Sequence, residues 1–191
     1  MTAPLFILVG GGARSGKTTY ALARARALGP RRLYVATAER DPPDGTADEE
    51  MRARIARHRA ERGDAFETIE EPLALPALLD ETMARGRHDV VLVDCLTLWL
   101  SNLLCRGAGE AEALARVGDL AAVLARRRAH VVVVTNEVGM GLVPETALGR
   151  LFRDVAGATH QRLAGAADEV HLAVMGLMLR VHPPPVLVTS Q

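Results

Sequence analysis

The sequence predicts an α/β domain with a mostly parallel sheet and a phosphate-binding loop, and two patterns support this fold class. Short apolar runs alternate along the chain with longer segments of helical periodicity, as they do where helices connect parallel strands. The loop after the first apolar run, GGARSGKT at 11–18, fits the P-loop pattern G-x-x-x-x-G-K-[ST]. With 191 residues the chain can form one sizeable core, so we expect a single domain over residues 1–191.

The expected strands are short runs rich in Val, Ile and Leu, which is typical of strands buried on both faces of a sheet. They cover residues 5–9, 32–36, 90–94, 131–134 and 170–174. The tail after residue 176 leaves room for one more strand, broken by the prolines at 183–185.

The expected helices cover residues 18–28, 46–62, 77–85, 96–104, 110–128 and 146–163. The helix at 46–62 begins with a capping-box pattern, TADE, and follows an exposed turn at 41–45. Residues 63–76 show a less regular pattern, and we expect no defined helix or strand in them.

Composition argues against several classes of protein. The 23 basic side chains balance the 23 acidic ones and aromatic residues make up only 3%, so we expect no nucleic-acid partner. No apolar run has the length of a membrane span and the N-terminus shows no secretion signal, so we expect a cytoplasmic protein. Cys95 and Cys105 lack metal-ligand spacing and are expected to be reduced thiols. The expected partner is therefore a small molecule.

The P-loop predicts a bound nucleoside triphosphate. Its glycines let backbone N–H groups turn onto phosphate oxygens, Lys17 supplies a compact positive charge, and the Thr18 hydroxyl can ligate Mg2+. A dinucleotide-binding fingerprint is the alternative, but Ser15 stands where its third glycine is expected. The predicted phosphate-binding residues are Gly11, Gly12, Ala13, Arg14, Ser15, Gly16, Lys17 and Thr18.

Two further segments are expected at the carboxyl-terminal edge of the sheet. Asp94 follows four apolar residues, and a carboxylate at that strand end can hold Mg2+ together with Thr18. The alternative is an aspartate that caps the next helix. The loop NEVGMG at 136–141 follows the strand at 131–134, and its two glycines allow a tight turn beside the nucleotide.

The helix at 46–62 carries a histidine on its apolar face. Met51, Ile55 and His58 share this face by their spacing. From spacing alone, His58 fits either a core residue with a hydrogen-bond partner or a catalytic group. Five nearby arginines, at 52, 54, 57, 59 and 62, suit either a polyphosphate or a solvated helix face.

Seven segments together resemble one enzyme family, the bifunctional adenosylcobinamide kinase and adenosylcobinamide-phosphate guanylyltransferase of cobalamin biosynthesis. They occur in the family's order and span nearly the whole chain. The segments are GGARSGKT (11–18), ATA (36–38), EMRARIARHRAER (50–62), TIEEP (68–72), DCLTLWLSNLL (94–104), TNEVGMGLVPE (135–145) and FRDVAG (152–157).

The resemblance implies a RecA-like P-loop fold assembled as a homotrimer, with active sites near the subunit boundaries. It implies one site that phosphorylates the aminopropanol hydroxyl of adenosylcobinamide with ATP or GTP. The same site then takes GMP from GTP onto a histidine and passes it to the new phosphate. The products of this second reaction are adenosylcobinamide-GDP and pyrophosphate.

The family motif E-M-x-x-R-I-x-x-H places the guanylylated histidine at His58. The second predicted catalytic residue is Lys17 of the P-loop. The predicted metal ligands remain Thr18 and Asp94, from the P-loop pattern and the strand-end carboxylate. Beyond the P-loop, the nucleotide-binding residues that the resemblance implies are Ala36, Thr37, Ala38, Arg59, Ala60, Glu61, Arg62, Glu70 and Asp94.

Three features depart from the family pattern: a longer turn at 41–46, His160 where asparagine is usual, and a tail that runs through three prolines. Two other functions stay open at this point. One is a P-loop small-molecule kinase without a covalent nucleotidyl step, in which His58 is structural. The other is a nucleotide-dependent switch that acts on a protein partner.

Overall fold

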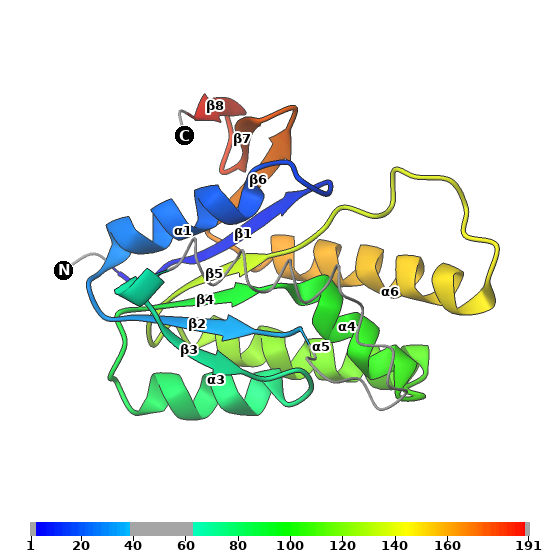
Figure 1. The fold of residues 1–191 in the computed structure, drawn as a ribbon, viewed down its shortest axis with the longest axis horizontal. Helices are drawn as coiled ribbons and strands as arrows, with labels where there is room; N and C mark the ends of the chain where they lie inside the picture. The colour runs from blue at the N-terminus through cyan, green and yellow to red at the C-terminus, as the bar shows by residue number, and fades with distance from the viewer. Residues whose placement is uncertain (1–2, 39–62, 190–191) are drawn as a thin grey trace.

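An eight-stranded sheet in the order β3-β2-β4-β5-β1-β6-β7-β8 runs through the computed structural model, which describes residues 3–38 and 63–189 (Figure 1). The strands from β3 to β6 in this order pair in parallel, and β7 and β8 add two antiparallel pairings at one edge. The strands are β1 (Phe6–Gly11), β2 (Arg32–Ala36), β3 (Glu67–Glu70), β4 (Val90–Asp94), β5 (His130–Val134), β6 (Glu169–Val174), β7 (Leu177–His182) and β8 (Leu187–Thr189).

Helices cover both faces of this sheet (Figure 1). One face packs against α1, and the other packs against α3, α4, α5 and α6. Within the described chain the helices are α1 (Lys17–Leu28), α3 (Leu75–Ala84), α4 (Leu96–Cys105), α5 (Glu110–Ala125) and α6 (Ala147–Ala164), with a short 3-10 turn, η1 (Gly63–Ala65). The predicted α/β fold with a mostly parallel sheet is confirmed.

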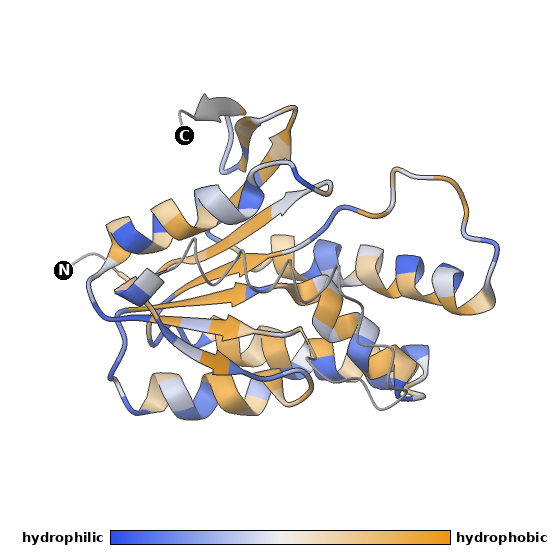
Figure 2. Cartoon of the chain, in the orientation of Figure 1, coloured by the Kyte–Doolittle hydropathy of each residue, from blue (hydrophilic) through white to orange (hydrophobic). Residues whose placement is uncertain are grey.

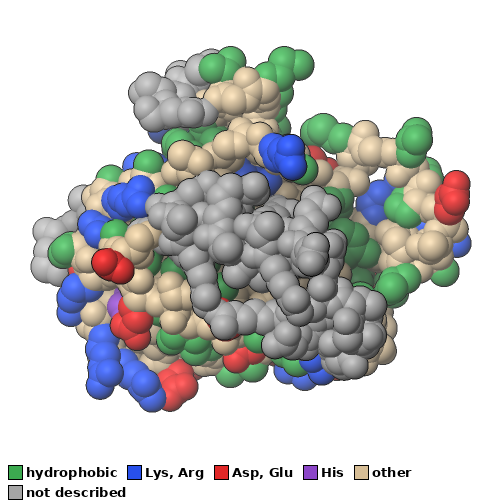
Figure 3. Space-filling model, in the orientation of Figure 1, with side chains coloured by type: hydrophobic (Ala, Val, Ile, Leu, Met, Phe, Trp, Pro, Cys, Tyr) green, Lys and Arg blue, Asp and Glu red, His purple; other side chains and the backbone are tan. Residues whose placement is uncertain are grey.

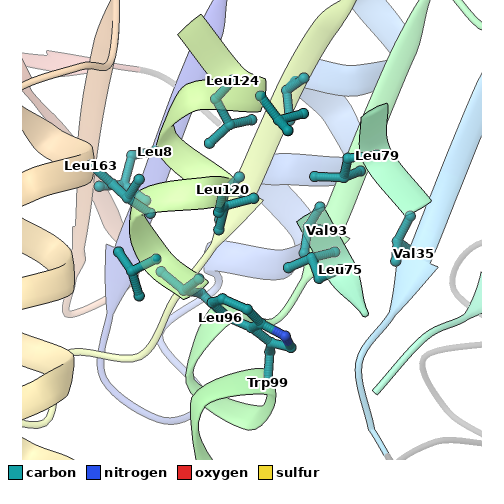
Figure 4. Close-up of a cluster of buried hydrophobic side chains, with 14 of the residues drawn as sticks. Leu8, Val35, Leu75, Leu79, Val93, Leu96, Trp99, Leu120, Leu124 and Leu163 are labelled. Atoms are coloured by element: carbon teal, nitrogen blue, oxygen red, sulfur yellow. The ribbon is translucent and has the colours of Figure 1, made fainter. Parts of the chain in front are cut away.

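Alternation along the buried strands divides the core into two clusters. In β1, Leu8 packs toward α6 and its Leu163, whereas Ile7 and Val9 pack toward α1. Figure 2 shows the central strands as almost continuously apolar, and Figure 4 shows the larger cluster, where Trp99 is completely buried. Each fully buried Leu, Ile or Val contributes about 1.5–3 kcal/mol, so slipping a strand by one residue is strongly disfavoured. This packing fixes where each strand ends.

One local prediction is wrong, and the start of one predicted helix is shifted. Residues 63–76 are not irregular throughout, because they contain β3 and the first turn of α3. β3 is a mostly exposed edge strand that pairs with β2, so it lacks the apolar run by which buried strands are predicted. α3 begins before the predicted residue 77 because Pro76 lies in its first turn, where a missing N–H costs no hydrogen bond.

The tail contains two strands where one was expected, since the prolines at 183–185 lie in the turn between β7 and β8. The other predicted strands and helices are confirmed with small shifts of their ends; α5, for example, stops at Ala125 instead of 128. The predicted turn at 41–45 and helix at 46–62 lie outside the described residues.

Candidate functional site

The carboxyl ends of the parallel strands form one row at an edge of the sheet. Backbone register aligns Glu70 with Ala36, Ala36 with Asp94, and Asp94 with Val134. β1 pairs with β5, so the P-loop at 11–18 leaves the sheet beside this row. The structure therefore brings the P-loop, Ala36, Glu70 and Asp94 to the carboxyl-terminal edge of the sheet, where parallel sheets bind ligands.

The P-loop connects β1 to α1, and it needs glycine near both ends. Gly11 has a φ of 151°, and a Cβ there would lie 2.7 Å from Ser15 Oγ, closer than such contacts occur in proteins. Gly16 has a φ of 90° and is the N-cap of α1. Lys17 is almost buried, and its ammonium group donates to the Gly12 carbonyl at 2.8 Å. The loop thus holds its cation at the positive end of α1, an arrangement suited to phosphate.

Asp94 faces the first turn of α1. The Thr18 hydroxyl donates to Asp94 Oδ2 at 3.3 Å, and the Tyr34 hydroxyl donates to the same oxygen at 2.8 Å. The alternative of a helix-capping aspartate is not supported, because the N-cap residue of α4 is Cys95 and not Asp94. Thr18 and Asp94 offer a hydroxyl and a carboxylate oxygen to the same space.

Tyr34 was not predicted as part of the site, although the sequence carried a signal. Side chains alternate along a strand, so Tyr34 lies on the same face of β2 as Ala36. Ala36 is in register with Asp94, and Tyr34 is in register with Leu92. A tyrosine two residues before a strand end could therefore have been expected to reach a carboxylate at the end of the neighbouring strand.

Thr37 is completely buried and joins the end of β2 to the start of α4. Its hydroxyl donates to the Cys95 carbonyl at 2.7 Å and accepts from the Cys95 N–H at 2.8 Å. The Asn102 amide donates to the Thr37 carbonyl at 2.8 Å. Burial, and to a smaller extent the charge of Asp94, raises the pKa of the Cys95 thiol to about 11. This cysteine is therefore a protonated thiol at neutral pH, and both cysteines are free.

Of the remaining predicted site residues, two lie in the described part of the chain and the others lie outside it. Ala38 is half-buried at the end of the segment that follows β2, and Glu70 is exposed at the end of β3. The predicted nucleophile and its neighbours lie outside the described residues: His58, Arg59, Ala60, Glu61 and Arg62.

A polar group behind the P-loop joins β5 to α6. Thr135 Oγ1 lies 2.7 Å from His160 Nε2, and His160 Nδ1 lies 3.8 Å from Glu137 Oε2. Burial lowers the pKa of His160 more than the Glu137 charge raises it, so the imidazole is neutral near pH 7. The position of residues 136–141 after a strand end was the sequence signal for Glu137. No sequence signal pointed to His160, which comes from the later helix α6.

Within residues 3–38 and 63–189, no three His, Cys, Asp or Glu side chains form a cluster that could hold a metal ion. A Mg2+ site with few protein ligands does not need such a cluster, because phosphates and water complete its octahedron. In the same residues, no helix combines the length and the apolar character that crossing a membrane requires.

Comparison with known proteins identifies the family. Residues 7–181 match the family described as cobinamide kinase / cobinamide phosphate guanyltransferase. The chain belongs to this family. It is 41% identical over 189 residues to the bifunctional adenosylcobalamin biosynthesis protein CobU of Salmonella typhimurium, across 93% of this chain and 99% of the relative. It is 41% identical over 184 residues to the bifunctional adenosylcobalamin biosynthesis protein CobP of Pseudomonas aeruginosa, across 93% and 98%.

This match confirms the resemblance that the sequence predicted. Cobinamide kinase / cobinamide phosphate guanyltransferase is a family of enzymes, and the chain is one of its members.

Solved structures agree with the predicted RecA-like fold. The RadB recombinase superposes with a TM-score of 0.50 at 18% identity, over 93% of this chain and 80% of that chain. A KaiC-like protein of Pyrococcus horikoshii gives 0.50 at 14% identity, over 100% and 80%. At these identities the likeness concerns the fold alone.

Proposed function

We propose that this chain catalyses two successive transfers in cobalamin biosynthesis. It phosphorylates the aminopropanol hydroxyl of adenosylcobinamide with ATP or GTP, and it then transfers GMP from GTP to the new phosphate. The observation that carries the proposal is that a member of this family holds its P-loop, Thr18 and Asp94 together at one sheet edge. Adenosylcobinamide-GDP and pyrophosphate would be the final products.

Phosphate binding falls to the loop at 11–18. Lys17 would neutralise charge on the transferred phosphoryl group, and the backbone N–H groups at the start of α1 would bind phosphate oxygens. Ala36, Thr37, Ala38 and Glu70 would border the nucleotide, since the ends of β2 and β3 lie in the same row as Asp94.

Thr18 and Asp94 would hold Mg2+, because a hydroxyl and a carboxylate oxygen are donors that this cation prefers. When bound, the ion would supply charge neutralisation on the triphosphate. Tyr34 would orient the Asp94 carboxylate through its 2.8 Å hydrogen bond.

His58 would be the nucleophile of the guanylyl transfer. Neutral imidazole is nucleophilic at pH 7 without a base to activate it, and a phosphoramidate is reactive enough to pass on its nucleotidyl group. The support is the motif EMRARIARH at 50–58, with the neighbouring residues at 59–62 as guanine-nucleotide contacts. Arginine guanidinium groups in that segment suit a polyphosphate.

We further propose that residues 1–191 form one domain. Three copies of the chain would assemble into a homotrimer in the cytoplasm. Apolar side chains stand exposed on the segment between β5 and α6, where Figure 3 shows green atoms on a projection of the molecule. Met140 is 83% exposed and Leu142 is 96% exposed. Such apolar exposure is typical of a surface that contacts a partner subunit.

The experiment is mass spectrometry of products from adenosylcobinamide, first with ATP and Mg2+ and then after addition of GTP. Two successive products, carrying a phosphoryl group and then a GDP group, are expected. A phosphorylated product without the second step would indicate the P-loop small-molecule kinase. If neither product forms, the nucleotide-dependent switch acting on a protein becomes the better hypothesis.

A further inference from the structure

Glu137 follows β5, the strand that lies between β1 and β4 in the sheet. β5 is flanked by β1 and β4 in the sheet, so the residues that follow β5 emerge between the loop after β1 and the carboxylate at the end of β4. The Glu137 N–H donates to the carbonyl of Gly11, the first residue of the P-loop, at 3.0 Å. The backbone of Glu137 is therefore fixed to the phosphate-binding loop.

The Glu137 carboxylate is held by one oxygen only. Oε1 accepts the Gly139 N–H at 2.5 Å, while Oε2 lies 3.8 Å from His160 Nδ1 and accepts no hydrogen bond from the described part of the chain. The side chain is 28% exposed. One carboxylate oxygen is therefore oriented and still open to a small molecule.

Two carboxylates at the amino-terminal end of β6, the opposite end of the strands from the P-loop, pair with arginines, whereas Glu137 has no such pair among the described residues. Glu169 pairs with Arg24 at 2.9 Å, and Asp168 pairs with Arg127 at 2.9 Å. Within residues 3–38 and 63–189, Glu137 pairs with no lysine or arginine. Its neighbour His160 is kept neutral by burial, which lowers the pKa of the imidazole, so it does not pair with this carboxylate as a cation.

A cavity of about 150 Å3 adjoins this carboxylate, lined in part by Gly10, Thr135 and His160. Among the residues that line it, Glu137 is the only carboxylate. Gly10 directly precedes the P-loop, so the cavity adjoins the start of that loop. A carboxylate in this position lies beside the P-loop, to which its backbone is hydrogen-bonded, and its exposure lets it release a proton to solvent.

We infer that Glu137 is the general base of the kinase reaction, which accepts the proton of the substrate hydroxyl through Oε2. In this step the O–H bond breaks and its proton passes to the carboxylate, while the hydroxyl oxygen forms a bond to the γ-phosphorus. The bond between that phosphorus and the bridging oxygen breaks, and the nucleoside diphosphate leaves with the electron pair. The proton then passes from Glu137 to solvent. This inference rests on the proposed function.

The second reaction does not need this base. Its acceptor is a phosphate monoester, which is already ionised at neutral pH and attacks without losing a proton. Loss of Glu137 should therefore separate two activities that share a single P-loop. A residue that only shapes the loops around the site would affect both reactions.

The test compares Glu137→Gln with the wild type in two single-turnover assays. One follows phosphorylation of adenosylcobinamide by ATP, and the other follows guanylyl transfer from GTP to adenosylcobinamide phosphate prepared beforehand. General bases contribute about 10²–10⁴ in rate, so the first reaction should slow at least about a hundredfold. The second should change less than about threefold. Glu112→Gln, an exposed carboxylate on α5, is the matched control and should change neither.

Each outcome decides the inference. An equal loss of both reactions would show that the Glu137 side chain only shapes the loop at 136–141 through its hydrogen bond to Gly139. Unchanged phosphorylation would place the general base elsewhere. Glu137→Asp should recover part of the phosphorylation rate that Glu137→Gln loses, because it restores a carboxylate. If the wild type itself forms no phosphorylated cobinamide, the proposed function fails, and this result is distinct from any difference between variants.

Discussion

The Tyr34 hydroxyl donates a 2.8 Å hydrogen bond to Oδ2 of Asp94, the oxygen that the Thr18 hydroxyl also contacts. Tyr34→Phe removes this donor and leaves the ring in the core. We expect about a tenfold rise in the Mg2+ concentration for half-maximal phosphorylation, because partners that orient a metal ligand typically contribute 10–100-fold in affinity. A Mg2+ titration of the ATP-dependent reaction measures it.

Tyr20→Phe is the matched control, since it removes the other tyrosine hydroxyl of the chain, which lies 3.1 Å from His171 Nδ1. Asp94→Asn, which deletes the charge itself, should have a larger effect than Tyr34→Phe. An unchanged titration in Tyr34→Phe would mean that this hydroxyl only stabilises the strand end.

Lys17→Ala tests whether one P-loop serves both reactions. Removing a fixed charge at the transferred group typically costs about 10²–10³ in rate, so phosphorylation and guanylyl transfer should both fall at least about a hundredfold. Rates at saturating nucleotide measure this, with circular dichroism as a control for folding. Near-normal rates in both assays would remove the P-loop from the mechanism.

The parts of the molecule that the sequence predicted are those fixed by local patterns. β4 and β5 are buried on both faces, so their valine-rich runs and their ends were visible without a structure. The P-loop pattern and the acid at the end of β4 together placed Thr18 and Asp94 at one edge. The register of neighbouring parallel strands made this edge continuous.

The parts that escaped prediction depend on contacts between distant residues. β3 is held by pairing with β2, and its own sequence, ETIE, has no apolar run. Tyr34 and Asp94 are 60 residues apart in the chain, and Thr135 and His160 are 25 apart. Hydrophobic periodicity describes each element alone, so it cannot show which polar side chains meet between elements.

Acid should destabilise the protein through His171. This ring is nearly buried, its Nε2 lies 2.8 Å from Glu169 Oε2, and burial lowers its pKa despite that carboxylate. Below pH 6.5 the unfolded chain binds a proton that the folded chain resists, so stability falls as pH decreases toward the folded-state pKa. His160 contributes in the same direction, since its pKa is also lowered by burial.

The measurement is urea unfolding at pH 7.5 and at pH 5.5. His171→Gln removes one titrating group, so the loss of unfolding free energy between the two values should be smaller in this variant than in the wild type. His182→Gln, at an exposed position on β7, is the control and should lose as much as the wild type. An equal loss in His171→Gln would assign the acid sensitivity to other groups.

Covalent guanylylation should map to His58. A guanylyl-histidine joins phosphorus to nitrogen, so its label should be lost in acid and kept in alkali, unlike a serine phosphoester. Enzyme incubated with GTP labelled at the α-phosphate and Mg2+ should hold such a label, and peptide mapping should place it within residues 55–62. His58→Ala should lose the label and guanylyl transfer together. Phosphorylation of adenosylcobinamide should fall less, because the P-loop alone positions the phosphates for in-line transfer.

The other histidines provide the controls for this assignment: 88, 130, 160, 171 and 182. Replacing any one of them should leave the acid-labile label in place. Among these, His160 is the most informative, because it lies behind the P-loop beside Glu137 and its imidazole is neutral. Label that persists in His58→Ala and disappears in His160→Asn would transfer the nucleophile to α6. If neither the wild type nor the variant holds the label, the better interpretation is a P-loop kinase without a covalent nucleotidyl step.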